Sequence, residues 1–198
     1  TSVARHLIES GIKIVSIGGD HSIAEPNVEG ILQAMPGKRL GFIHIDEHND
    51  VREGHLGGYC SGDWGRELLN NYPDQMLGKN VCKIGMSEFT NNPKDSQYVQ
   101  DMGATVVTAV EVWEKGIRYA IDKALDVAGD DTDAIYISID VDGMDQSSAP
   151  GTPAPNPFGI DARDVAMAVR QWARHPKTVG VEVAELVPAY DHDNMTAN

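Results

Sequence analysis

The sequence predicts an α/β protein with three layers, in which helices cover both faces of a mainly parallel central sheet. Short runs rich in β-branched and other apolar residues alternate with helical patterns along the chain. Several of these runs are apolar throughout, as parallel strands are when both faces of the sheet are buried. The length of 198 residues and the hydrophobic content of 41% suffice for one core.

The apolar runs predict the strands in the following order. We expect them at residues 12–17 (IKIVSI), 40–45 (LGFIHI), 81–86 (VCKIGM), 104–107 (ATVV), 134–139 (AIYISI) and 178–184 (TVGVEVA). The segments between them predict helices near residues 2–10, 22–34, 64–71, 95–102, 110–128 and 161–174. Asp161 begins the last of these helices and belongs to the residue types that cap helix N-termini.

The chain is organised as one domain over residues 1–198, since it contains no internal repeat and no linker. The Pro/Gly-rich segment 149–159 follows a strand closely, so we interpret it as an active-site loop. Thr1 opens directly into a helical pattern, and Asn198 closes the chain just after a motif-rich stretch. We therefore expect the chain to be a fragment that lacks N- and C-terminal parts.

The charge balance narrows the class of partner. The net charge is −14 and the pI is about 4.7, which argues against nucleic acid or an anionic membrane and suits a small cationic substrate. No apolar run is long enough to span a bilayer, and no signal-peptide pattern is present. Cys60 and Cys82 are too few for a disulfide framework, so we expect a cytoplasmic location.

Acidic and histidine residues follow four of the predicted strands. Open α/β sheets bind ligands beyond the carboxyl ends of their strands, so these positions are the candidates for a functional site. The four stretches are GGDHS (18–22), DEHND (46–50), DVDGMD (140–145) and ELVP (185–188). Each motif alone also has a simpler interpretation as a turn, a cap or a solvated loop, but their joint occurrence after strands favours a common site.

The carboxylates in these stretches predict a site for two metal ions. Asp46 and Asp50, together with Asp140 and Asp142, carry a total charge of −4, which two divalent cations would balance. Histidine side chains at His21 and His48 would complete a mixed oxygen and nitrogen ligand set that suits Mn²⁺. Two such ions would lower the pKa of a shared water and supply a nucleophile at neutral pH.

The three motifs GGDHS, D-x-H-x-D (46–50) and S-x-D-x-D (138–142) resemble the metal-binding signatures of the ureohydrolase superfamily, the family of arginases and agmatinases. The stretch 185–188 is similar to the family's terminal Glu-x-x-Pro, and the residues that follow it look like the agmatinase branch. The resemblance implies an arginase-like α/β/α fold, a binuclear Mn²⁺ site and hydrolysis of a C–N bond in a guanidino or amidino group. It also implies a longer chain and a trimeric or hexameric assembly.

The resemblance further implies a role for each residue of the motifs. One ion would be bound by His21, Asp46, Asp50 and Asp140, and the other by Asp46, His48, Asp140 and Asp142. Asp46 and Asp140 would thus bridge the two ions, and Asp50 would hold the attacking oxygen by a hydrogen bond. Glu185 would accept hydrogen bonds from the planar cation of the substrate, since a carboxylate matches a guanidinium fork.

The sequence departs from the agmatinase pattern around residue 61. Ser61 stands where a proton-relaying histidine is usual, and Asp50-Val-Arg52 followed by Ser-Gly looks instead like formimidoylglutamases. His55 is the candidate for the missing relay, and Asn49 and Ser61 are the candidates for substrate contacts beside Glu185. These departures favour a changed substrate preference, and they leave Ni²⁺ as an alternative to Mn²⁺.

Three functions stay open at this stage. The leading hypothesis is a metal-dependent hydrolase that acts on agmatine or another small guanidino compound and releases urea and an amine. The first alternative is formimidoylglutamate hydrolysis, which would release formamide. The second is a catalytically weak subunit that supports an active paralogous partner, although the complete set of metal ligands argues against it.

Overall fold

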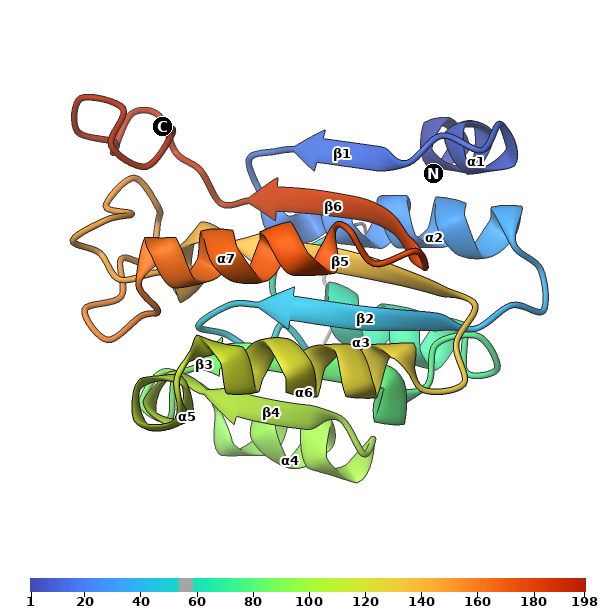
Figure 1. Cartoon of the computed structure of the whole chain (residues 1–198), viewed down its shortest axis with the longest axis horizontal. Coiled ribbons are helices and arrows are strands. Elements are labelled where there is room, and N and C mark those ends of the chain that lie inside the picture. Colours follow the sequence, from blue (N-terminus) through green and yellow to red (C-terminus); the bar gives the residue numbers. More distant parts are fainter. Residues whose placement is uncertain (54–58) are drawn as a thin grey trace.

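A computed structural model describes residues 1–53 and 59–198. Its six strands form one parallel sheet in the order β1-β6-β5-β2-β3-β4. The strands are β1 (Ile14–Ile17), β2 (Leu40–Ile45), β3 (Val81–Met86), β4 (Thr105–Thr108), β5 (Ala134–Asp140) and β6 (Thr178–Ala184). All arrowheads therefore point to the same edge of the molecule (Figure 1). The predicted fold class and all six predicted strands are confirmed, with shifts of one or two residues at some ends.

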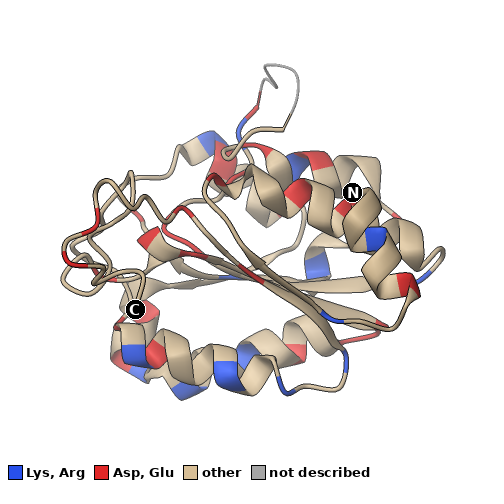
Figure 2. Ribbon diagram, turned by 90° about the horizontal axis from the view of Figure 1, so that it is seen from above, with Lys and Arg blue, Asp and Glu red and all other residues tan. Residues whose placement is uncertain are grey.

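Helices lie on both faces of the sheet, so the fold has three layers (Figure 2). The helices are α1 (Ser2–Glu9), α2 (Ala24–Ala34), α3 (Trp64–Asn71), α4 (Pro93–Asp101), α5 (Ala109–Lys115), α6 (Ile117–Gly129) and α7 (Ala162–Trp172). Short 3-10 turns occur at η1 (His21–Ile23), η2 (Gly78–Asn80) and η3 (Val141–Gly143). The cap predicted at Asp161 is present, because its side chain accepts a hydrogen bond from the backbone of Arg163.

The single helix predicted over residues 110–128 is wrong. The structure has two helices there, α5 and α6, which meet at Gly116. Gly116 has a φ of 81°, in the left-handed region where glycine carries no steric penalty, so the first helix ends at this residue. The apolar periodicity continues across the break, and for this reason the pattern alone predicts one element.

Two hydrophobic clusters fill the spaces between the layers. One packs α5, α6 and α7 against one face of the sheet, around the buried Trp172. The other packs α1, α2 and α3 against the opposite face, around Trp64 and Phe42. Gly41 shows how tight the first contact is, since a Cβ atom there would lie 1.8 Å from the carbonyl oxygen of Ala128 in α6.

Among the residues that the structure describes, no helix combines the length and the apolar character that a membrane span requires.

Candidate metal centre

Strand pairing brings the four predicted motifs to one place. Neighbouring β2 and β5 pair Ile45 with Ile139, so Asp46 and Asp140 leave the sheet side by side. On the other side of β5, Asp140 pairs with Ala184, the residue before Glu185. Strand β1 pairs with β6 and leads into η1, which begins at His21. The carboxyl ends of four adjacent strands therefore supply the whole cluster, as expected for a parallel sheet.

His21 is the centre of the first group of ligands. Its ring is buried, and its Nδ1 atom lies within 3.4 Å of carboxylate oxygens from Asp46 (3.4 Å), Asp50 (3.1 Å) and Asp140 (3.0 Å). Neither this Nδ1 atom nor Oδ2 of Asp46 makes a hydrogen bond of normal geometry with a described residue. Buried polar atoms that converge in this way without hydrogen bonds fit a metal ion, because a cation satisfies all of them at once.

His48 and Asp142 form the second group. The Nδ1 atom of His48 lies 3.1 Å from Oδ2 of Asp142 and 3.4 Å from Oδ1 of Asp46. Asp46 thus turns one oxygen toward each group, and it belongs to both of the clusters with ligand spacing. This arrangement fits the predicted bridging role of Asp46. Asp140 lies against His21, and its predicted role as a second bridge stays a prediction.

Backbone N–H groups hold the carboxylates in place. The Oδ1 atom of Asp140 accepts a hydrogen bond from the backbone of Asp142 (2.9 Å), and Oδ1 of Asp142 accepts one from the backbone of Glu47 (3.2 Å). Asp50 has a φ of 49°, a left-handed conformation that turns the chain back toward the cluster. The indole N–H of Trp64 donates to Oδ2 of Asp50 at 2.8 Å. The loops therefore orient the ligands before any ion binds.

Without ions, the cluster holds protons in their place. Burial lowers the pKa of His48, but hydrogen bonds to Asp142 and Asp46 outweigh it and raise this pKa to about 11. Burial and the charge of Asp46 raise the pKa of Asp142 to about 7. The pKa of His21 is raised well above its usual value, because contacts with Asp140, Asp46 and Asp50 outweigh the effect of burial.

Because metal ions compete with these protons for the same side chains, we expect the metal affinity to increase with pH. An ion must displace the proton of His48 below pH 11 and also that of Asp142 below pH 7. We expect the affinity for Mn²⁺ to rise at least about tenfold per pH unit between pH 6 and 8, with a steeper slope below pH 7. Titration of the metal-free protein in buffers of different ionisation enthalpy measures the protons released. An affinity independent of pH would contradict this assignment of the ligands.

Three residues near the cluster were missed by sequence reasoning. The Nε2 atom of His44 lies 2.8 Å from Oδ2 of Asp46, and its Nδ1 atom lies 2.8 Å from Nζ of Lys83. Burial lowers the pKa of His44 to about 3 and that of Lys83 to about 8. The third is Glu182, a buried carboxylate of β6. The available signal was the same for all three, namely a charged or titratable residue inside an otherwise apolar strand.

A cavity of about 170 Å³, which we call the metal cavity, opens over the cluster. Glu185 lines it, as predicted, and its Oε1 atom accepts a hydrogen bond of 2.6 Å from the backbone of His21. Ser61 lines it as well. The complete lining consists of His21, His48, Asp50, Arg52, Ser61, Gly62, Asp140, Asp142, Pro153, Ala154 and Glu185.

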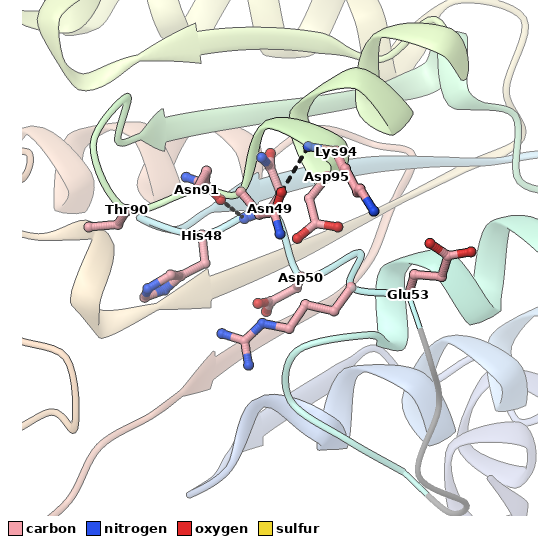
Figure 3. A pocket seen from close by; sticks show the side chains of 10 residues that line it. His48, Asn49, Asp50, Glu53, Thr90, Asn91, Lys94 and Asp95 are labelled. Carbon is pink, nitrogen blue, oxygen red and sulfur yellow. Dashed lines mark hydrogen bonds between the residues drawn. The ribbon is translucent and has the colours of Figure 1, made fainter.

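Figure 3 shows the residues that line a second cavity of about 340 Å³, which we call the outer cavity. His48, Asp50 and Arg52 line both cavities. Asn49 lines the outer cavity but not the metal cavity, and its backbone N–H donates to Oδ1 of Asn91 at 2.8 Å. Substrate contacts by Asn49 and Ser61 stay predictions. The predicted relay residue His55 lies outside the described residues.

A model of the arginase family matches residues 1–198. The chain belongs to the arginase family. It is 34% identical over 181 residues to the formimidoylglutamase of Bacillus subtilis, covering 91% of this chain and 56% of that protein. It is 31% identical over 194 residues to the mitochondrial agmatinase of Gallus gallus, covering 96% and 54%. This arginase-family chain thus spans little more than half the length of these relatives.

Solved structures agree with this placement. The crystal structure of the Bacillus subtilis formimidoylglutamase matches with a TM-score of 0.91 and 31% identity, covering 98% of this chain and 60% of that one. A variant of Trypanosoma cruzi formiminoglutamase, whose crystal structure is described with Mn²⁺, matches with a TM-score of 0.88 and 27% identity, covering 96% and 62%. These relatives favour the formimidoylglutamase alternative over the agmatinase-like hypothesis that the sequence motifs alone suggested.

Proposed function

We propose that this chain forms the metal-binding part of a hydrolase that cleaves the C–N bond of formimidoylglutamate and releases formamide and glutamate. The observation that carries the proposal is the position of Arg52, a cationic side chain that lines both the metal cavity and the outer cavity. A substrate whose amidine lies over the metal cluster would extend its remaining part past Arg52. A dicarboxylate tail is attracted there, whereas the ammonium tail of agmatine is repelled.

The local backbone supports this position of Arg52. Its backbone N–H donates to the carbonyl of Gly62 at 2.8 Å. A Cβ atom at residue 62 would lie 2.9 Å from both Cδ and Nη1 of Arg52, so the arginine side chain lies directly against the glycine. The Ser61-Gly62 pair therefore leaves the space that the arginine occupies. Lys94 adds a second cation to the lining of the outer cavity, which also includes the carboxylates of Glu53 and Asp95. We therefore base the proposal on Arg52, which lines both cavities, and not on the overall charge of the outer cavity.

The remaining residues have roles that follow from their positions. Two divalent ions, with Mn²⁺ the best match to the ligand set, would supply an activated water when bound. Asp50 lies among the ligands of the cluster, and its carboxylate would accept a hydrogen bond from that water. The Glu185 carboxylate uses Oε1 on the backbone of His21, and Oε2 is the oxygen that would accept an N–H of the amidine.

We also propose a homo-oligomer and a resident pair of Mn²⁺ ions, with Ni²⁺ as the competing metal. A weak supporting subunit is disfavoured, because such a subunit would have no need for the oriented ligands of both groups.

Analysis of the products tests the proposed reaction. The full-length protein, loaded with Mn²⁺, is incubated with formimidoylglutamate, agmatine, arginine and a small neutral amidine. We expect formamide from formimidoylglutamate, with kcat/KM at least about 10²-fold above that for agmatine, since a favourable charged contact is replaced by a repulsive one. Urea from agmatine at the higher rate would overturn the proposal in favour of the agmatinase hypothesis. Absence of bound ions together with no turnover of any substrate would favour the supporting subunit.

A further inference from the structure

Behind the metal cluster, on the far side of His21, lies the buried carboxylate of Glu182. It belongs to β6, is fully buried and does not line the metal cavity. Its Oε1 atom accepts a hydrogen bond from the hydroxyl of Ser138 (2.7 Å), and its Oε2 atom accepts one from Tyr136 (2.7 Å) and one from Asn27 (3.1 Å). The Nε2 atom of His21 lies 3.9 Å from Oε1 of Glu182, and within the described part of the chain no Lys or Arg forms an ion pair with this carboxylate. A buried carboxylate whose nearest basic side chain is a histidine points to a role toward that histidine.

Glu182 determines which atom donates and which accepts in the hydrogen bonds that link it through Ser138 to His21. An ionised carboxylate only accepts hydrogen bonds, so the Ser138 hydroxyl must donate its hydrogen to Glu182. The Oγ atom of Ser138 also lies 2.7 Å from Nε2 of His21, and with its own hydrogen already used it must accept there. His21 therefore carries a hydrogen on Nε2. In the neutral ring this leaves the lone pair on Nδ1, the atom that faces the three carboxylates of the cluster.

We propose that Glu182 is a positioning residue of the metal centre, which acts through Ser138 to hold His21 in the ring tautomer whose Nδ1 atom binds a metal ion. Second partners of this kind fix the orientation and tautomer of ligating histidines in metal sites. The inference rests on the metal site but not on the identity of the substrate. A failure of the formimidoylglutamate assignment therefore leaves it intact, and the reverse also holds.

Glu182→Gln exchanges donor and acceptor in the hydrogen bonds from residue 182 through Ser138 to His21, and it preserves the shape of the side chain. Two donors, Tyr136 and Asn27, face the Oε2 position, so the amide oxygen of glutamine would occupy that side. The amide N–H₂ would then face Ser138, which would accept from it and turn its own hydrogen toward His21. The ring would take up the opposite tautomer, with its hydrogen on Nδ1, where it blocks an ion. The same substitution removes a buried charge and should not destabilise the metal-free fold.

The test separates metal binding from folding and uses the full-length protein. Mn²⁺ affinity is measured by competition with a chelator, and thermal unfolding is measured on the metal-free protein. We expect Glu182→Gln to weaken the binding of one ion by about 10–100-fold, with no loss of metal-free stability. Tyr136→Phe is the matched control, because it removes one donor to Glu182 but leaves Ser138 donating to Glu182 and accepting from His21. Its affinity for both ions should stay near that of the wild type.

Two results would overturn the inference. One is unchanged affinity for both ions in Glu182→Gln, and the other is an equal loss in Tyr136→Phe, which would indicate general loosening of the buried network. If Glu182→Gln does not fold, Ser138→Ala removes the relaying hydroxyl itself. Weaker binding of one ion in that variant supports the inference, and unchanged binding overturns it.

Discussion

Asp46→Asn is expected to remove both metal ions and nearly all hydrolytic activity. Asp46 belongs to both groups of ligands, with Oδ2 beside His21 and Oδ1 beside His48. Asparagine preserves the shape of the side chain but removes the charge, and its amide group places a donor where an ion must bind. Loss of the several kcal/mol that bound metal contributes to the transition state corresponds to a decrease in kcat/KM of about 10³-fold or more.

Metal analysis of the purified variant, together with its kcat/KM, measures this effect. Asp122→Asn is a suitable control, because Asp122 lies on the exposed side of α6 and the substitution makes the same chemical change. The control should bind two ions and retain activity. If Asp46→Asn still bound two ions with the affinity of the wild type, the bridging position assigned to Asp46 would be wrong.

Arg52→Met is expected to impair the binding of an anionic substrate selectively. Arg52 lines both cavities, and a charge-assisted hydrogen bond from its guanidinium to a substrate carboxylate would contribute about 1.5–3 kcal/mol. Its loss corresponds to an increase in KM of about 10–100-fold for formimidoylglutamate. A formimino compound without carboxylates lacks this contact, and its KM should change little. Arg52→Lys should fall between the two, since lysine keeps the charge but loses the planar fork.

Steady-state kinetics with both substrates decides this prediction. Arg163→Met serves as the control, because the Arg163 side chain is 90% exposed and lies on α7. Equal changes in KM for the charged and the neutral substrate would show that Arg52 acts on the shape of the cavity and not on the charge of the tail. In that case the main support for a dicarboxylate substrate would be lost.

Much of the candidate site was accessible from the sequence because a parallel sheet has a simple geometry. Strand ends such as those before Asp46 and Asp140 meet at one edge whatever the order of the strands, so acids that follow strands can be expected to gather there. Glu185 and Ser61 line the metal cavity, and their contacts with substrate stay predictions. The sequence does not predict the helix break at Gly116, because the helical spacing of apolar residues continues past this glycine and does not indicate its backbone conformation.

The sequence by itself determined the α/β class, the six strands and the set of acids and histidines that can hold two ions, because hydrophobic period and residue chemistry are local properties. Only the tertiary structure decided which oxygen of Asp46 faces which histidine, and that Lys83 lies behind His44. It also decided that Glu182 is linked to His21 through Ser138, since these two hydrogen bonds connect β6 to β5 and β5 to η1. The physical reason is that these contacts depend on which strands are neighbours and in which register, and residues far apart in the sequence acquire that relation only when the sheet forms.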